Sequence, residues 1–439
     1  MPSEPAVGLS APNHEVVEQG ALGLVDHHDL RVPQLQLVQA RGEAEHGAVI
    51  EGVERGGAAN RLGDAADAAP LVVQGVDGPA APRAAAWSAR NWGRREEQRL
   101  LVPRRRAVPA VRRHFICQPP LSHLAMHTVR RDAMSHEDGT LGALLGLAVG
   151  DALGAQVEFA HPQVVREVVA RGLEMVDSGY WAAGQWTDDT ALALELAESI
   201  AERGLLDADD VARRYISWAT TDGRGIGRAT RAALMGASDA AEARRRASAF
   251  QARTGMGASN GTVMRCAPIG LAARDREQAR AAAAEDARLT HGHPATAAAS
   301  AALCTALVAM RQGEDPLAAA SAEAHGLPDL ERALELAVGD DRDALALLAA
   351  GPAAGACWTT LSIGLCALIW LGDYASGVTW AVSLGGDTDT NAAVAGALLG
   401  YRDGADAIPA RWLKPLAQRD RLERAAVRLA RHAEAPSPR

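Results

Sequence analysis

The chain has 439 residues, of which 48% are hydrophobic and 23% are charged, and its formal net charge is −9. This is the composition of a globular protein, and the negative balance gives no electrostatic reason to expect nucleic acid or an anionic membrane as a partner. The five cysteines form no C-x-x-C pair and are odd in number. They argue against a disulfide framework and favour free thiols in a reducing cytoplasm, where we expect the protein to be located.

Residues 1–133 differ from the rest of the chain. They contain scattered Pro and Gly without a sustained helical period, and an Arg-rich stretch, residues 94–113, that Pro103 and Pro109 interrupt. One interpretation is a basic arm that touches nucleic acid; the other is a leader of low order, or read-through sequence ahead of a start at Met134. We favour the second and expect residues 134–439 to form one domain. No basic region followed by an apolar core opens the chain, so no signal peptide is expected.

After Met134 the hydrophobic pattern has the period of a helix almost everywhere. No run of alternating β-branched residues indicates a sheet. We therefore predict a compact all-α domain of about 300 residues. The clearest predicted helices are residues 189–203, 207–218, 276–289, 295–311 and 391–401.

One uncharged stretch, residues 344–372, is long enough to span a bilayer. However, Gly351 and Pro352 interrupt it, and polar residues follow Trp358 in its middle. We predict two buried pieces of a helical core there, and not a membrane span.

Four glycines recur at steps of four in the first helix of the domain, at positions 142, 146, 150 and 154. This spacing stacks them on one face. A glycine inside a helix costs about 1 kcal/mol relative to alanine, so four of them indicate a close contact with another helix. Asp151 lies on the same, otherwise apolar, helix; we interpret it as a buried anion that hydrogen-bonds backbone near a site, with a direct ligand role as the alternative.

The first acidic cluster is Thr187-Asp188-Asp189, followed at once by an apolar helix. Threonine and aspartate are common helix N-caps, so capping stays an open alternative for this cluster alone. Two adjacent carboxylates nevertheless exceed what a cap needs.

The second acidic cluster holds Asp387, Asp389 and Thr390, and it also precedes an apolar helix. If the two clusters meet in the fold, four carboxylates and several hydroxyls converge without a soft ligand. Such a group repels itself strongly in a site of low dielectric unless cations are present. All-oxygen ligation selects Mg²⁺, Mn²⁺ or Ca²⁺ over zinc, and a pair of ions is the simplest interpretation.

Six motifs together resemble the ADP-ribosylglycohydrolase family, and in the order that this family has them. The resemblance covers residues 139 to about 413, and each motif alone would be weak evidence. The motifs are residues 146–154 (GLAVGDALG), 186–190 (WTDDT), 260–268 (NGTVMRCAP), 290–294 (THGHP), 385–390 (GGDTDT) and 408–409 (IP) before Trp412.

The resemblance implies a compact all-α fold with a binuclear centre of two Mg²⁺ or Mn²⁺ ions. It also implies an enzyme that cleaves the glycosidic bond between ADP-ribose and an acceptor, such as an arginine or serine side chain or a small conjugate. By position, one ion would be held by Thr187, Asp188, Asp189 and Asp389, and the other by Asp387, Asp389 and Thr390.

The candidate catalytic residues that the resemblance implies are Glu158, Asp189 and Asp389, with Glu158 as the acid or base. A loop that cradles ADP-ribose is implied at Gly257, Ser259, Asn260 and Gly261, with His291 as a neighbouring contact. Glycine-rich backbone of this kind can bring N–H groups close to a diphosphate.

Several alternatives remain open at this stage. His291 and His293 are also candidates for core or helix-start histidines, and Arg265 for a partner of a site carboxylate or of a surface acid. The loop at residues 223–227 (GRGIG) lacks an acidic residue that some family members carry, and Asn391 replaces a frequent glycine. We expect Asn391 to perturb the site little, with an altered helix entry as the alternative, and both departures bear on the substrate class and not on metal binding.

Two other functions compete with the hydrolase. One is an ADP-ribose-binding protein of the same fold without turnover, against which the complete set of metal-type residues argues. The other is a helical diphosphate lyase, whose D-D-x-x-D pattern is not completed here, because Leu192 stands where the last aspartate is needed.

Overall fold

A computed structural model of the protein describes residues 135–204 and 206–434. Within these ranges the regular elements are all helices, and strand-type pairing is limited to one isolated bridge between Ser259 and Ala356. The all-α prediction is confirmed. The interpretation of residues 1–133 as a leader lies outside the described residues, so the predicted domain boundary stays a prediction.

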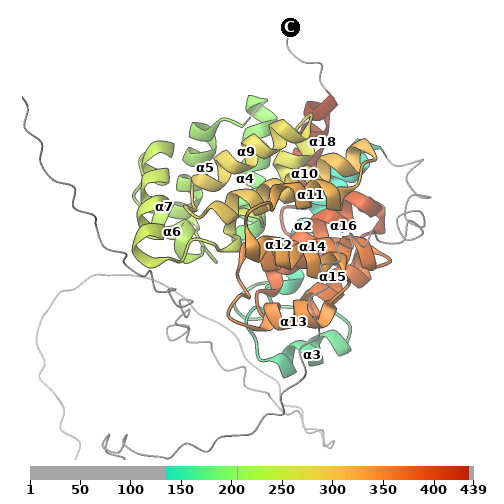
Figure 1. Cartoon of the computed structure of the whole chain (residues 1–439). Coiled ribbons are helices and arrows are strands. Elements are labelled where there is room, and N and C mark those ends of the chain that lie inside the picture. Colours follow the sequence, from blue (N-terminus) through green and yellow to red (C-terminus); the bar gives the residue numbers. More distant parts are fainter. Residues whose placement is uncertain (1–134, 205, 435–439) are drawn as a thin grey trace, which may run out of the picture. The chain divides into compact units, whose positions relative to one another are not determined.

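The helices are labelled in Figure 1. Their bounds are α2 His136–Gly154, α3 Pro162–Ala170, α4 Asp188–Arg203, α5 Ala208–Thr221, α6 Arg228–Leu234, α7 Ala240–Thr254, η2 Asn260–Thr262, α8 Ala267–Ala272, α9 Arg276–Arg288, α10 Pro294–Gln312, α11 Pro316–Glu323, α12 Pro328–Val338, α13 Arg342–Ala350, α14 Cys357–Trp370, α15 Tyr374–Ser383, α16 Thr388–Asp403, η3 Ala405–Ala407, α17 Ala410–Leu413 and α18 Arg419–Glu434.

The centre of the described fold is the antiparallel pair α2 and α16 (Figure 1). The predicted glycine face of α2 lies directly against α16, confirming the expected close contact. A Cβ on Gly142, Gly146 or Gly150 would lie 2.2, 2.3 or 2.1 Å from a backbone oxygen of α16. Because no side chain separates the helices, the end of α2 meets the start of α16.

The five predicted helices are confirmed in type and nearly in extent. The two that follow the acidic clusters begin earlier than predicted, α4 at Asp188 and α16 at Thr388. The carboxylates of Asp188, Asp189 and Asp389 therefore lie in first helical turns, where the helix dipole favours negative charge. The predicted helices, which begin at residues 189 and 391, had left Asp188 and Asp389 outside.

The uncharged stretch at residues 344–372 forms two separate helices, α13 and α14, with the break where Gly351 and Pro352 predict it. α14 is buried as expected. The expectation that both pieces are buried is wrong for α13, because only its Leu345 and Ala349 are buried and Leu347 is 76% exposed. Another helix, α10, is long and apolar enough to cross a membrane, but 78% of its apolar window is buried in protein.

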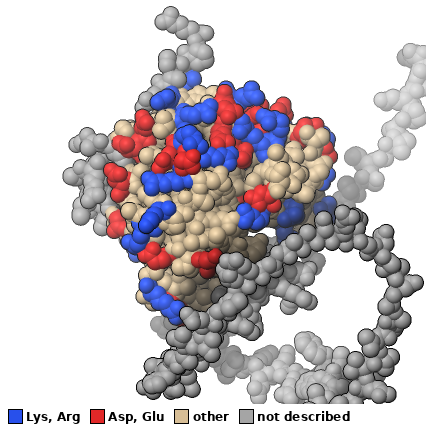
Figure 2. Space-filling view, turned by 180° about the vertical axis from the view of Figure 1, so that it is seen from behind, with Lys and Arg blue, Asp and Glu red and all other residues tan. Residues whose placement is uncertain are grey.

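Four cysteines are free and buried, at positions 266, 304, 357 and 366, as predicted; Cys117 lies outside the described residues. On the face drawn in Figure 2, acidic and basic side chains are interspersed and not separated by sign. Some ion pairs join helices. Arg421 of α18 contacts Glu195 and Glu198 of α4 at 2.9 and 2.6 Å.

Candidate metal centre and substrate loop

Asp151, near the end of α2, fixes the start of α4. Its completely buried carboxylate accepts hydrogen bonds from the backbone N–H groups of Thr187 and Thr190, at 3.0 Å each, and from the Thr190 hydroxyl at 2.6 Å. Burial raises the pKa of Asp151 to about 6, although these hydrogen bonds act in the opposite direction. The hydrogen bonds to backbone predicted for Asp151 are thus present.

The first acidic cluster occupies the N-terminus of α4. Thr187 is the N-cap, and its hydroxyl accepts from the backbone N–H of Asp189 at 3.3 Å. Asp188 and Asp189 follow in the first turn and are 7% and 2% exposed. Gly225 lies against Asp188, because a Cβ on that glycine would be 2.7 Å from Oδ1 of the aspartate. Capping and a cluster of buried carboxylates therefore coexist here.

The second acidic cluster occupies the N-terminus of α16. Asp387 is the N-cap but makes no side-chain capping bond, so its carboxylate is not used by its own helix. Asp389 and Thr390 are buried in the first turn. The Thr388 hydroxyl donates to the backbone oxygen of Gly154 at 2.8 Å, which ties this cluster to the end of α2.

Glu158 follows α2 and lies beside the second cluster. Carboxylate oxygens of Glu158, Asp387 and Asp389 all lie within 4.8 Å of one another. The next residue, Phe159, has a left-handed backbone and donates its N–H to the oxygen of Gly386 at 2.8 Å. Glu158 is the exposed member of the group, so it is the one placed to meet a ligand from solvent.

The two clusters lie close together, because the starts of α4 and α16 are both hydrogen-bonded to the end of α2, and the charges of each cluster raise pKa values in the other. Desolvation of the carboxyl by the surrounding protein, together with the charges of Asp387, Asp188 and Asp151, raises the pKa of Glu158 to about 8. Burial and the charge of Asp151 raise the pKa of Asp188 to about 7. The pKa of Asp189 lies well above its usual range through burial and the charges of Asp151, Asp188 and Asp387.

The same causes act on Asp389. Burial and the charges of Glu158, Asp387 and Asp189 raise its pKa well above the usual range. A nearby cation stabilises the ionised form of carboxyls that are buried close to one another.

A second observation also indicates that these oxygen atoms would bind a hard cation. Oδ2 of Asp189 is buried and has no hydrogen-bond partner among the described residues, which is costly for a carboxylate oxygen unless a ligand fills the position. The atoms around it are carboxylate and hydroxyl oxygens, which suit Mg²⁺ or Mn²⁺. The predicted metal residues are thus brought together, while the number of ions belongs to the proposal below.

The predicted substrate loop lies between α7 and α8 and reaches the second cluster. Its backbone pairs with residues 355–357, because Asn260 donates to the oxygen of Gly355 and Cys357 to that of Ala258, both at 3.0 Å. The side-chain amide of Asn260 donates to Oδ2 of Asp387 at 3.0 Å. Gly257 packs against Gln251, where a Cβ would clash with the side chain.

His291 contacts this loop through a hydrogen bond to Ser259. Its Nε2 lies 2.7 Å from the hydroxyl of Ser259, and its Nδ1 lies 2.8 Å from that of Thr290. Gly261 has no room for a side chain, since its Cβ would lie 2.9 Å from the His291 ring. Burial and the charge of Arg265 lower the pKa of His291 to about 3, so the imidazole is neutral at physiological pH.

Arg265 corrects one expectation. It pairs with Asp286 at 3.0 Å, and both side chains are completely buried, so its partner is neither a site carboxylate nor a surface acid. The guanidinium also donates to the backbone oxygen of Gly261 at 2.9 Å and lies over the ring of Tyr215. This buried ion pair therefore holds the end of the substrate loop.

Three further residues change the interpretation of the sequence. His293 is the N-cap of α10 and accepts from the backbone N–H of Ala295, which bears out the helix-start alternative. Asn391 was expected to perturb the site little. It is completely buried and accepts from the hydroxyl of Thr360, a residue that was not among the predicted site residues, so the expectation of a small effect stays a prediction.

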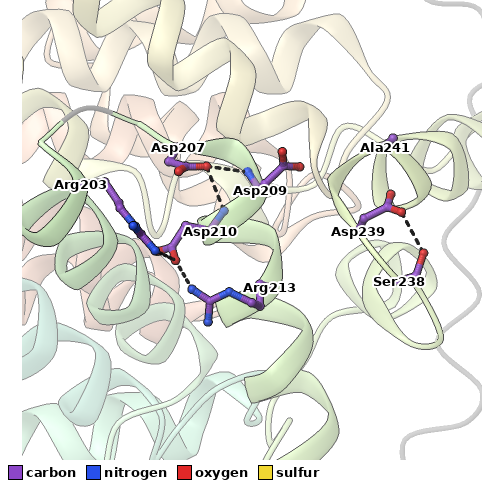
Figure 3. A pocket seen from close by; sticks show the side chains of 8 residues that line it. All are labelled: Arg203, Asp207, Asp209, Asp210, Arg213, Ser238, Asp239 and Ala241. Carbon is purple, nitrogen blue, oxygen red and sulfur yellow. Dashed lines mark hydrogen bonds and ion pairs between the residues drawn. The ribbon is translucent and has the colours of Figure 1, made fainter.

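A separate surface pocket of about 590 Å³ lies at the starts of α5 and α7 and contains none of the predicted site residues (Figure 3). Three of the four carboxylates that line it have local partners. Asp207 caps α5, Asp239 caps α7, and Asp210 pairs with Arg203 and Arg213. The pocket therefore adds nothing to the site.

Comparison with known proteins identifies the family. The profile described as ADP-ribosylglycohydrolase matches residues 132–439. The chain belongs to the ADP-ribosylglycohydrolase family. The resemblance inferred from the six motifs is thereby confirmed.

Relatives of this ADP-ribosylglycohydrolase agree. It is 31% identical to the ADP-ribosyl-[dinitrogen reductase] glycohydrolase of Rhodospirillum rubrum, over 64% of this chain and 91% of that protein. It is 30% identical to an ADP-ribosylarginine hydrolase of Pseudomonas putida, over 66% of this chain and 78% of that protein. A solved structure described as an ADP-ribosylglycohydrolase-related protein complex has 35% identity and a TM-score of 0.52, covering 68% of this chain and 99% of that one.

Membership in this family makes the protein an enzyme that cleaves glycosidic bonds. The buried carboxylates and the adjoining glycine-rich loop lie within the matched residues. The competing interpretation as a helical diphosphate lyase loses its support.

Proposed function

We propose that this ADP-ribosylglycohydrolase depends on divalent cations and removes ADP-ribose from a modified protein side chain, such as arginine or serine, or from a small conjugate. The observation that carries the proposal is the convergence of Glu158, Asp387 and Asp389 within 4.8 Å, beside the raised-pKa carboxyls of Asp188 and Asp189. We further propose a cytoplasmic location, on the free cysteines.

Two ions of Mg²⁺ or Mn²⁺ would be held by the two helix starts. Thr187, Asp188, Asp189 and Asp389 supply oxygens for one ion, and Asp387, Asp389 and Thr390 supply oxygens for the other, with Glu158 nearby. Bound there, hard cations would polarise a water molecule and fix the hydroxyls of a ribose.

The chain's own residues divide the remaining work. Glu158 is exposed, and backbone hydrogen bonds hold the residues on either side of it. It is therefore the candidate to transfer a proton to or from the leaving group. Asp189 and Asp389 supply negative charge near the sugar carbon, where an oxocarbenium-like transition state develops positive charge. The backbone of residues 257–261 offers N–H groups to the diphosphate, with Ser259 held by His291.

The acceptor is the least constrained part of the substrate. The named relatives act on ADP-ribosylated dinitrogen reductase and on ADP-ribosylarginine. In this chain, the loop that packs Gly225 against Asp188 carries Arg224, whose guanidinium pairs with Asp222 at 2.7 Å. A substrate panel must therefore include acceptors with and without positive charge.

The test measures the release of ADP-ribose from arginine-, serine- and nucleic-acid-linked substrates, with Mg²⁺ and with EDTA. We expect release from at least one protein-linked substrate, its loss with EDTA, and its loss in Asp387→Asn. Asp406→Asn is the control, because Asp406 is exposed near the far end of α16. Release that survives both chelation and Asp387→Asn would contradict the proposal, and tight binding of ADP-ribose without release from any substrate would favour a binding protein.

A further inference from the structure

A chain of buried hydrogen bonds starts at Asp387 and returns to the same helix at Asn391. Nδ2 of Asn260 donates to Oδ2 of Asp387 at 3.0 Å and to Oγ1 of Thr360 at 2.9 Å. The hydroxyl of Thr360 donates onward to Oδ1 of Asn391 at 2.9 Å. Thr360 and Asn391 are completely buried, and the other two residues are 7% exposed. This series of hydrogen bonds thus connects the substrate loop, α14 and α16.

With Asn391 oriented as in the structure, where its buried Nδ2 has no partner among the described residues, these hydrogen bonds have one consistent set of directions. The amide oxygen of Asn391 can only accept, so the single hydroxyl hydrogen of Thr360 is committed to it. The Thr360 oxygen then accepts from Asn260, whose two N–H groups are both used, one on Thr360 and one on Asp387. A flipped amide would turn its oxygen toward the Asp387 carboxylate, which cannot donate when ionised. The Asp387 carboxylate and the Thr360 hydroxyl, whose hydrogen is turned toward Asn391, therefore both favour the amino end of the Asn260 amide.

Asp387 needs an external support of this kind. It is the N-cap of α16, yet its side chain makes no capping bond that would hold it in place. Asn260 supplies a donor to one carboxylate oxygen and leaves the other oxygen for a cation. Partners that hydrogen-bond a metal ligand generally set its orientation and affect metal affinity strongly.

We propose that Thr360 and Asn391 are positioning residues that act through Asn260 to orient Asp387 for metal binding. The side chain of Asn260 serves the metal ligand, whereas the sequence analysis had assigned this residue to the substrate. This inference rests on the proposed metal-dependent function and adds two residues to its site.

The test measures binding of Mn²⁺ alone to the full chain, by calorimetry or by the electron paramagnetic resonance of free Mn²⁺. Thr360→Val keeps the shape of the side chain but removes its hydroxyl, and we expect Mn²⁺ affinity to fall about 10- to 100-fold, as for other partners of metal ligands. Thr360→Ser keeps the hydroxyl, so it should restore most of the affinity.

Thr359→Val is a matched control. Thr359 precedes Thr360 on α14 and is equally buried, but within the described part of the chain its hydroxyl has no hydrogen-bond partner. The same substitution at this position should leave Mn²⁺ affinity unchanged. If Thr360→Val does not fold, Asn391→Leu replaces it, since that variant removes the final acceptor at similar volume, and the same loss of affinity is expected.

The outcomes separate this inference from the proposed function. If the wild-type chain binds Mn²⁺ and Thr360→Val binds it equally well while losing only thermal stability, the two residues merely join α14 to α16 and the inference is wrong. An unchanged Mn²⁺ affinity with weaker binding of ADP-ribose would return Asn260 to the substrate and would also contradict it. A wild-type chain that binds no Mn²⁺ would instead contradict the metal site itself.

Discussion

The hydroxyl of Thr190 donates to Oδ2 of Asp151 at 2.6 Å, so the end of α2 holds the first turn of α4. The same end of α2 also holds the start of α16. The glycine contact between these helices brings the Thr388 hydroxyl to the backbone oxygen of Gly154, to which it donates. One helix end thus positions both acidic clusters. The convergence of carboxylates depends on a backbone arrangement as much as on the carboxylates themselves.

Asp151→Ala should destabilise the protein and weaken cation binding together. The substitution leaves the N–H groups of Thr187 and Thr190 buried without an acceptor, and we expect the free energy of unfolding to fall by about 2 to 4 kcal/mol. Asp151→Asn keeps one acceptor oxygen and should lose less. Denaturant unfolding measures the change, with Asp209→Ala, an exposed carboxylate in the first turn of α5, as the control. Equal stability of the Asp151→Ala and Asp209→Ala variants would show that Asp151 is not an anchor.

Asp189→Asn should stabilise the protein without metal and stabilise it less with metal. Without divalent cations, the loss of one charge relieves repulsion among crowded carboxylates, so the melting temperature should rise. With Mg²⁺ the gain should shrink, because a site that binds at 100 times its Kd contributes about 2.7 kcal/mol and the variant binds less.

Thermal melts in EDTA and in Mg²⁺ measure both effects for Asp189→Asn, the wild type and Asp209→Asn. The control should follow the wild type in each buffer. A wild-type melting temperature that does not respond to Mg²⁺ would speak against a cation at this centre.

Gly150→Ala tests the contact between α2 and α16. Helix propensity alone predicts that alanine stabilises a helix by about 1 kcal/mol relative to glycine. Here the new Cβ would lie 2.1 Å from the backbone oxygen of Ala392, which cannot move without separating the helices. We expect a loss of about 3 kcal/mol or more, because added volume in a packed contact is destabilising.

Gly372→Ala is the control for this prediction. No atom lies within 4 Å of the Cβ that this substitution would add. Its free energy of unfolding should stay within about 0.5 kcal/mol of the wild type. A stabilised Gly150→Ala variant would show that α2 and α16 lie farther apart than described.

Local pattern in the sequence was enough to predict the helices, the glycine face and the two acidic clusters. Each of these rests on neighbours within a few residues, such as the spacing of Gly142 and Gly146. The partners of site residues were harder to predict, because Asn260 meets Asp387 at a separation of 127 residues and Thr360 at 100. A threonine inside an apolar helix carries no sign of such a role until the fold brings α14 beside the loop.

The same limit explains the two wrong expectations. α13 is apolar in sequence, but whether Leu347 is covered depends on which helices pack over it. From the sequence, Arg265 could pair with any acid. The fold brings it beside Asp286 and over the ring of Tyr215. Burial and pairing are properties of the assembled fold, so composition and period alone do not determine them.

His291 predicts how stability depends on pH. Its pKa is lowered to about 3 in the folded chain, below the usual value of 6.5, so between these values the unfolded state binds a proton that the folded state does not. Stability from this group is therefore complete above pH 6.5 and is lost as the pH falls toward 3. One such proton contributes a slope of about 1.4 kcal/mol per pH unit.

His291→Asn removes this titration while it keeps polar atoms near Ser259 and Thr290. The free energy of unfolding, measured from pH 7 to pH 4, should fall less steeply in this variant than in the wild type, by up to the slope of one proton. His325→Asn is the matched control, the same substitution at a histidine whose side chain is 97% exposed. The comparison uses slopes and not absolute stabilities, so it holds even if the asparagine packs less well than histidine. Identical slopes for the wild type and His291→Asn would mean that His291 titrates in the folded chain as it does in the unfolded one, and that water reaches the ring beneath the substrate loop.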